Sequence, residues 1–593
     1  MAESYWNQGL GRRFSRRRAL TATGGAAAAA LLAACGGSDT PDDASKTSSL
    51  IVPVVDETKN VKRGGIYKEA RPTPATLDPH LLGGHVSETQ HAYSTLFRIA
   101  DGHMKDTDYS IEGELVESWE LSADKLTLTG KLTQNANFAP LPPINGRRVE
   151  MQDILFSWER FRTLGARRSD VVNEANPDAP VVSLTSPDDR TIVIKFKEPN
   201  ATALALLASA SPGALNIIPR EAESPRVLDL RSMSLGSGPF YMSELKPSVG
   251  MSFKKNPGFK WDKRDVPYIE GIEYYDVSEY AALLAQFKAG ALWAFSGGVR
   301  AEDVLNTKRD VPELILMDSG IATSATRGFF GHNPDSPFKD ERVRQAWVLT
   351  WDRDLFIDVI YNVSKFAQGG LQMETAWAGA LPASDSGWYI NPKSKEFGPN
   401  AKYFEHSPSE AKKLLTAAGY PNGLDTSLYY ATTFPVWFYQ QSEILIGMVR
   451  DSALFRPTIH EVNYQTDWNT TFRYNRGKFS GAGFVRDTGA PHPVNNLFYH
   501  YHTNGGANFG GDSTMDDLLV KAQREFDTKR AMTLAHEVQR YEGGKAFYPL
   551  AGGASSLTLS WPVERNKGVW NGGSNRNKAL IWMDQEKPPI KRA

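Results

Sequence analysis

The chain contains a single cysteine, Cys35, and this feature constrains its fold more than any other. One cysteine cannot form an intramolecular disulfide or build a metal cage from several thiolates. The 593 residues must therefore be held together by packed cores, and this length predicts two or more domains. With 41% hydrophobic and 23% charged residues and a net charge of -1, the composition predicts a soluble globular protein. It excludes a disordered chain or a polytopic membrane protein and gives no sign of a nucleic-acid partner.

Cys35 closes a segment with the layout of a secretory signal. Five arginines lie between residues 12 and 18, and an apolar stretch too short to span a bilayer follows at residues 21–34. Residues 15–20 (SRRRAL) resemble a twin-arginine export motif, and residues 32–35 (LAAC) resemble a bacterial lipobox, whose cysteine is acylated. We predict a signal peptide at residues 1–34 and a lipidated flexible linker at residues 35–61. The alternative is an uncleaved anchor, or an arginine-rich tail before an alanine-rich helix.

The remaining chain mixes strand and helix signals. Residues 125–131 and 190–196 alternate apolar and polar side chains, which is typical of half-buried strands. Capping signals predict where helices begin and end: starts after Asp340, Ser407 and Ser513, and ends at Gly290 and Gly419. Gly238, in a turn rich in glycine and proline, is expected to take a positive φ. The mixture predicts an α/β fold with several lobes.

Motifs of the common enzyme classes are absent from the sequence. No serine has glycine on both sides at the spacing of a nucleophile elbow, and neither a zinc-protease helix motif nor a phosphate-binding glycine loop is present. The densest group of histidines is His492, His500 and His502. A metal site there is one interpretation, but surface or loop histidines are the better one. We therefore expect no enzyme activity, no metal and no cofactor.

Six ordered segments resemble one family, the extracytoplasmic solute-binding proteins of ABC importers in the peptide, nickel and oligosaccharide class (family 5). They are residues 64–79, 114–122, 145–160, 236–257, 338–353 and 407–423. The last of these (SPSEAKKLLTAAGYPNG) is close to the family's DPEKAKALLAEAGYPDG. Six motifs in the right order are far more specific than any one of them alone.

This resemblance implies a two-lobed periplasmic-binding-protein type II fold with an extra inserted subdomain and a two-strand hinge. Lobe I would cover residues 62–325, with the insertion at about 80–210. Lobe II would cover residues 326–535, and residues 536–593 would return to lobe I. A monomer is expected, with the permease subunits of an ABC transporter as partners and the membrane reached through the lipid on Cys35.

One segment of the resemblance bears on the ligand. Residues 483–491 resemble the family segment G-W-x-x-D-x-x-D-P, whose first aspartate anchors the ammonium group of a bound peptide. Asp487 aligns with that aspartate, and Phe484 stands where an aromatic residue lines the cleft. The alternative is that Asp487 is an ordinary turn residue. Ala490 replaces the second aspartate of the pattern, so the departure leaves the peptide assignment open.

Three tryptophans suggest a different class of ligand, a sugar. Trp377, Trp388 and Trp437 stand beside Gly, Pro or Ser, where aromatic rings could stack on sugars, although a core position is the alternative for each. Trp347 and Trp351 are expected on an internal helix, in the protein core. The functions that remain are an oligopeptide-binding protein, an oligosaccharide-binding protein of the same fold, a secreted lipoprotein hydrolase, and a receptor that transports nothing.

Overall fold

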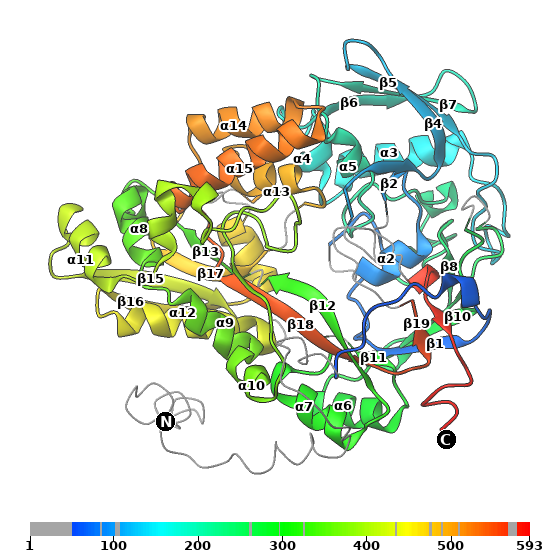
Figure 1. The fold of residues 1–593 in the computed structure, drawn as a ribbon. Helices are drawn as coiled ribbons and strands as arrows, with labels where there is room; N and C mark the ends of the chain where they lie inside the picture. Colours follow the sequence, from blue (N-terminus) through cyan, green and yellow to red (C-terminus); the bar gives the residue numbers. More distant parts are fainter. Residues whose placement is uncertain are drawn as a thin grey trace.

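Two lobes joined by a pair of long strands make up the protein (Figure 1). The computed structural model describes residues 50–592, apart from residues 83–85, 101–106, 260–263, 296, 324–325, 433–435, 474–476, 488–489, 508–509 and 567–577. Cys35, the predicted signal peptide and linker residues 35–49 lie outside the described residues. Within the described residues, no helix combines the length and hydrophobicity that a membrane span requires.

The first lobe is built on a five-stranded sheet. Its strands, in spatial order, are β11 (Ala294–Phe295), β1 (Ile66–Ala70), β10 (Gly271–Tyr275), β9 (Gly250–Lys255) and β8 (Phe240–Lys246). β1 runs parallel to both of its neighbours, whereas β8, β9 and β10 are antiparallel. Other elements of this lobe are η3 (Thr58–Asn60), α2 (Val86–Ala92), η4 (Arg220–Glu223), α6 (Tyr280–Ala289), α7 (Ala301–Asp310), β19 (Glu564–Arg565) and β20 (Trp582–Met583).

A second sheet forms the part of the first lobe that we call the inserted subdomain, residues 116–207. Its antiparallel strands are β4 (Val116–Leu121), β5 (Thr127–Leu132), β7 (Thr191–Phe196) and β6 (Val181–Thr185). Its helices are α3 (Met151–Leu164), α4 (Arg168–Val171) and α5 (Ala203–Leu207), and the ribbon of β2 (Phe97–Ile99) and β3 (Ile111–Gly113) precedes it. β5 and β7 confirm the two strands predicted from alternation, because Leu128, Ile192 and Ile194 point into the core.

The second lobe has a four-stranded sheet. Its strands, in spatial order, are β13 (Thr326–Phe330), β17 (Ala482–Arg486), β15 (Leu424–Ala431) and β16 (Phe455–Val462). Its helices are α8 (Glu341–Val348), α9 (Arg353–Tyr361), α10 (Val363–Gln368), α11 (Pro408–Ala417), α12 (Val436–Asp451), α13 (Pro493–Tyr501), α14 (Ser513–Arg524) and α15 (Thr528–Lys545). Short helices are η5 (Pro337–Lys339), η6 (Lys395–Phe397), η7 (Pro399–Phe404) and the π-helix η8 (Tyr464–Arg473). Trp347 and Trp351 are fully buried, as predicted.

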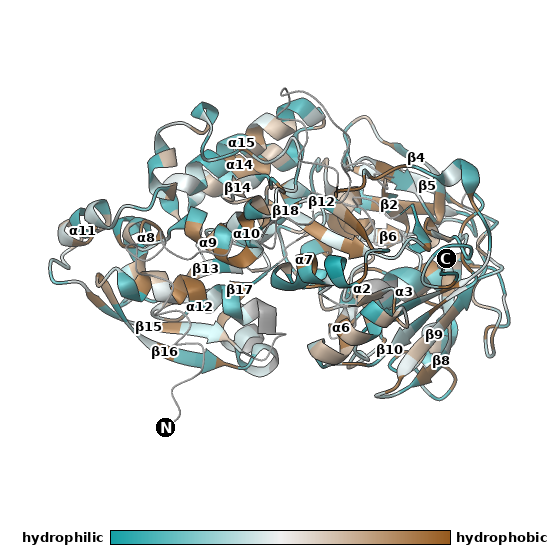
Figure 2. Cartoon of the chain, turned by 60° about the horizontal axis from the view of Figure 1, so that its bottom comes forward, coloured by the Kyte–Doolittle hydropathy of each residue, from teal (hydrophilic) through white to brown (hydrophobic). Residues whose placement is uncertain are grey.

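The two lobes are joined by β12 (Ile315–Thr323) and β18 (Gly552–Ser560), which pair antiparallel, with β14 (Thr375–Trp377) on the other edge of β18. β12 leads out of the first lobe into β13, and β18 leads back toward β19. Their register shifts between Asp318 and Ile321, where Gly320 has a φ of 78°. A bulge of this kind bends a strand pair locally. Figure 2 shows the lobes on either side of these strands.

The helix ends test the capping predictions. The Asp340 side chain accepts a hydrogen bond from the Arg342 backbone at the start of α8, and Gly290 is left-handed after α6, as predicted. The prediction that Ser513 caps a helix was wrong, because the Asp512 side chain accepts from the Met515 backbone one residue earlier. Gly238 does not have a positive φ. A glycine is needed at this position for another reason: a Cβ would lie 2.5 Å from the His91 carbonyl oxygen.

One helix crosses a predicted domain limit. α15 is a continuous helix through residues 535 and 536, and it packs on α14 and α8 of the second lobe. The chain therefore leaves the second lobe through β18, which lies after residue 536, where the return to the first lobe was predicted.

Candidate functional site

Asp487 lies directly after β17, at the carboxyl end of a strand that pairs in parallel with β15. Ligands of open α/β sheets bind outside the carboxyl ends of such strands. The residue is 6% exposed, and its Oδ1 is 3.8 Å from Nε2 of His500, which is fully buried. His500 Nδ1 lies 3.0 Å from the Asn496 carbonyl oxygen, and this contact fixes the orientation of the ring. A buried carboxylate therefore stands at the edge where a ligand is expected.

The neighbouring Arg486 carries the opposite charge. Burial lowers the pKa of its guanidinium to about 10, and the charges of Tyr464 and Asp487 act against that effect. The side chain remains positive at neutral pH. Because side chains alternate along β17, Arg486 lies on the same face as Phe484, so the group at the expected ligand edge is the Asp487 carboxylate.

A buried arginine on the neighbouring strand β13, where it pairs with Val485, supports this region. Arg327 of β13 donates to the Tyr501 hydroxyl at 3.0 Å, to the Tyr548 carbonyl at 3.2 Å and to the Ala380 carbonyl at 3.3 Å. Nearby, Glu542 accepts from the Phe547 and Tyr548 backbones. Burial raises the pKa of Glu542 to about 7. This network could not be predicted from the sequence, because its members come from four distant segments.

The two lobes meet at a cluster around Tyr109. Its hydroxyl donates to Asp385 Oδ1 at 3.1 Å, and its ring packs edge-on against Trp388 and His492. Desolvation raises the pKa of the Asp385 carboxyl to about 7, although the residue as a whole is only partly buried. Burial lowers the pKa of His492 to about 3, so this imidazole is neutral at physiological pH.

Phe484 does not line a cleft. It is fully buried, and its ring centroid lies 5.7 Å from that of Trp351 and 6.3 Å from that of Trp347. Because side chains alternate along β17, Phe484 points into the core of the second lobe. The prediction that it contacts ligand was wrong.

The three predicted stacking tryptophans have different surroundings. Trp388 is 2% exposed and packs against His492, so it provides no open platform. Trp377, in β14, donates from Nε1 to Asp354 at 2.8 Å, and the Lys393 ammonium lies 4.4 Å from its ring centroid. Trp437 belongs to α12, and its side chain lies outside the described part of the structure.

The three clustered histidines are buried, so the prediction of surface residues was wrong, although His492 and His502 lie in the loops before and after α13 as predicted. His500 lies in the last turn of α13. His492 Nδ1 accepts from the Val494 backbone, and His502 Nδ1 accepts from Asn504. No group of three metal-ligating side chains is present among the described residues.

The first lobe contributes a buried ionic group that was not predicted from the sequence. Glu69 contacts the Arg71 guanidinium at 2.6 Å and the Lys578 ammonium at 2.5 Å. Burial raises the pKa of Glu69, but these two cations outweigh it and lower the pKa to about 2. The alternation in β1, which buries Tyr67 and Glu69 on the same face, was the available signal.

The profile of the middle region of bacterial extracellular solute-binding proteins, family 5, matches residues 110–508. The chain belongs to this family. As a family 5 protein it is an extracytoplasmic solute-binding protein of ABC importers. Heme-binding protein A of Haemophilus influenzae is 25% identical over 415 residues, which cover 64% of this chain and 69% of that protein. Di/tripeptide-binding protein 1 of Pseudomonas aeruginosa is 22% identical over 445 residues, with coverages of 72% and 77%.

Solved structures share the fold of this family 5 chain. The periplasmic binding protein DppA of Helicobacter pylori, in complex with the peptide STSA, superposes with a TM-score of 0.68 at 20% identity, covering 89% of this chain and all of DppA. AgaA of A. tumefaciens R10, in complex with agropinic acid, gives 0.67 at 20% identity, with coverages of 88% and 99%. The two-lobed periplasmic-binding-protein fold is thereby confirmed.

Proposed function

We propose that this family 5 protein is a lipid-anchored binding protein that captures an oligopeptide between its lobes and delivers it to an ABC import permease. The observation that carries the proposal is the buried Asp487 at the carboxyl edge of the second-lobe sheet. Closure about β12 and β18 would bring the first lobe over this edge. Ligand binding then stabilises the closed form by its higher affinity for that form.

The chemistry of a peptide suits this edge. A free peptide carries an ammonium group, which can donate hydrogen bonds to the Asp487 carboxylate. In a closed site from which water is excluded, charge-assisted hydrogen bonds of this kind are strong and directional. Relatives named for peptide binding, among them the di/tripeptide-binding protein and the oligopeptide-binding protein OppA of Haemophilus influenzae, support the same ligand class.

An oligosaccharide is the weaker proposal. Stacking on sugars needs an aromatic face that a ligand can reach, but Trp388 is enclosed in the contact between the lobes. The Lys393 ammonium lies over one face of the partly exposed Trp377 ring, where a sugar would have to displace it. Neither residue favours a sugar over a peptide.

Calorimetry on Asp487→Asn tests the ammonium anchor. With a peptide recovered from the protein after incubation with a defined pool, we expect the substitution to weaken binding by about 2–5 kcal/mol, because a buried charge pair is lost. Acetylation of the peptide amino terminus should weaken wild-type binding similarly and have little further effect on Asp487→Asn. Asp451→Asn, an exposed residue at the end of α12, is the control. Equal affinities for wild type and Asp487→Asn would remove Asp487 from the ligand site.

A further inference from the structure

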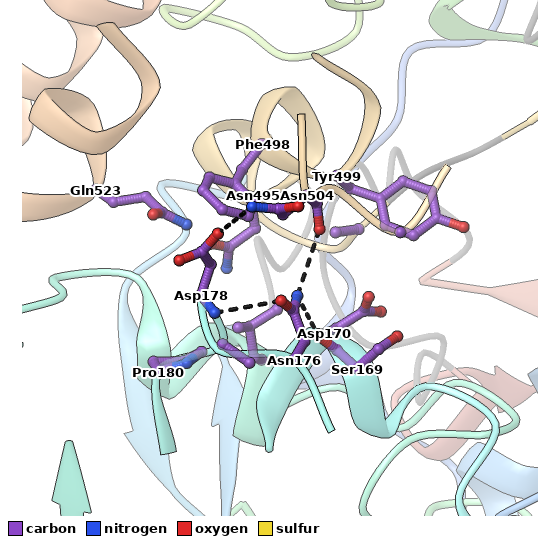
Figure 3. A pocket seen from close by; sticks show the side chains of 14 residues that line it. Ser169, Asp170, Asn176, Asp178, Pro180, Asn495, Phe498, Tyr499, Asn504 and Gln523 are labelled. Atoms are coloured by element: carbon purple, nitrogen blue, oxygen red, sulfur yellow. Dashed lines mark hydrogen bonds between the residues drawn. The ribbon is translucent and has the colours of Figure 1, made fainter. Parts of the chain in front are cut away.

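The inserted subdomain contacts α13 and the loop after it through a set of side-chain hydrogen bonds that we call the interlobe latch: Thr202, Asn495, Asp178 and Asn504. The Thr202 hydroxyl donates to Asn495 Oδ1 at 2.6 Å, and Asn495 Nδ2 donates back to the Thr202 carbonyl at 3.0 Å. Both residues are buried, at 5% and 3% exposure. Asn504 Nδ2 donates to Asp178 Oδ2 at 2.6 Å, as Figure 3 shows. Each bond joins one lobe to the other.

Further contacts surround the latch. The Ala201 backbone donates to the Gln523 carbonyl at 2.7 Å, so the two lobes are also joined through their main chains. The Arg167 guanidinium lies 5.3 Å from the ring centroid of Tyr499, within the range of a cation–π interaction. Figure 1 shows α4 and α5 beside α13 and α14 at this position.

The latch leaves no room for a solute. The cavity beside it, lined by residues of both lobes including Asn176, Asn495 and Gln523, has a volume of about 20 Å³. A space of this size holds about one water molecule. The hydrogen bonds of the latch therefore join protein to protein, and their free energy stabilises the closed arrangement of the lobes.

We propose that the interlobe latch positions the two lobes in the closed state and thereby sets the affinity for solute from outside the ligand site. If the lobes separate, Thr202 and Asn495 lose each other as partners. In the closed state, each gives the other the hydrogen bonds that burial demands. The latch thus favours closure whatever solute is bound.

The consequence for binding is quantitative. The apparent dissociation constant of a protein that binds only in its closed form equals the intrinsic constant divided by the closed fraction. A latch that raises the closed fraction therefore tightens the binding of every solute by the factor by which that fraction rises. Loss of one buried hydrogen-bonded pair is expected to lower this ratio by on the order of tenfold.

Single-molecule energy transfer across the lobes tests the proposal without a known ligand. One label is attached at Lys195 of the inserted subdomain and one at Lys412 of α11, each replaced by cysteine in a chain that carries Cys35→Ser. Both positions are exposed. We expect the ligand-free chain to populate the short interlobe distance, and Thr202→Val to reduce the closed-to-open ratio by on the order of tenfold. Thr202→Ser retains the hydroxyl and should restore the ratio.

Controls separate the latch from a general effect on folding. Thr185→Val changes an exposed threonine of the same subdomain and should leave the ratio unaltered. Asn504→Ala, on the exposed half of the latch, should shift the ratio in the same direction as Thr202→Val, and it serves in its place if the buried variant does not fold. A ligand-free protein that is always open would overturn the proposal, as would equal ratios in the wild type and the latch variants.

Discussion

Glu88 shows how burial alone can control the charge of a single residue. It is 1% exposed in α2, and among the described residues neither of its carboxylate oxygens has a hydrogen-bond partner. Burial raises its pKa from 4.5 to about 7, while the charge of Arg71 acts in the opposite direction. The folded protein therefore binds a proton at Glu88 more tightly than the unfolded chain does.

This predicts a pH dependence of stability at one position. A carboxyl group with a raised pKa contributes stability below its unfolded pKa and loses it as the pH rises through the folded value. We expect the free energy of unfolding of Glu88→Gln minus that of wild type to be larger at pH 8 than at pH 4, by up to about 3 kcal/mol, because only the wild type loses stability over this range. Chemical denaturation at the two pH values measures this. Glu120→Gln, on the exposed face of β4, should show no such change, and an equal difference in both variants would contradict the argument.

Phe484 and Asp487 show how far the candidate site could be predicted. Both were chosen from one short resemblance, but Phe484 proved to be a core residue. In a strand covered on both faces, the pattern of apolar residues does not tell which face meets a ligand. Tyr109, Asp385 and Arg327 gave no local signal, because their contacts exist only once distant segments have packed.

At the level of secondary-structure elements, the start of α14 gives the clearest test of which residue caps a helix. Asp512 accepts from the Met515 backbone at the start of α14, and its other oxygen accepts from the Tyr541 hydroxyl at 2.7 Å. We expect Asp512→Ala to lower the free energy of unfolding by about 1–2 kcal/mol. Ser513→Ala, at the neighbouring residue that the sequence favoured as the cap, should have almost no effect. Thermal or chemical denaturation of the pair decides between them, and a larger loss in Ser513→Ala would show that the cap is wrongly assigned.

The fold could be predicted from sequence where its cause is local. Alternation gave β5 and β7, and the Asp340 cap gave the start of α8. α11 begins after Ser407 as predicted, but the Ser407 side chain makes no capping hydrogen bond, and Pro408 occupies the first helical position. The pairing of β12 with β18 could not be derived from periodicity, because the strands lie far apart in the chain and meet only in the assembled protein. The family resemblance supplied the expectation of a hinge, but it did not give these residues.

We propose that Cys35 attaches the whole molecule to a membrane. A lipid-modified cysteine would hold the protein at the outer face of the cytoplasmic membrane, provided that more than one acyl chain is attached. We expect Cys35→Ala to move the protein from the membrane fraction to the soluble extracytoplasmic fraction, as measured by fractionation and blotting. Replacement of the nearby Ser38 by alanine is the control. Continued membrane retention of Cys35→Ala would show that another segment provides the anchor.

The central claim is that the two lobes enclose a peptide without breaking it. The most direct measurement incubates the purified protein with a pool of peptides of known sequence, removes the unbound fraction, and identifies the retained and the remaining peptides by mass spectrometry. We predict that a subset is retained at about one per protein molecule, as expected for a single interlobe site, and that every peptide in the pool is recovered intact. Retention of none of them, or the appearance of cleavage products, would contradict this account.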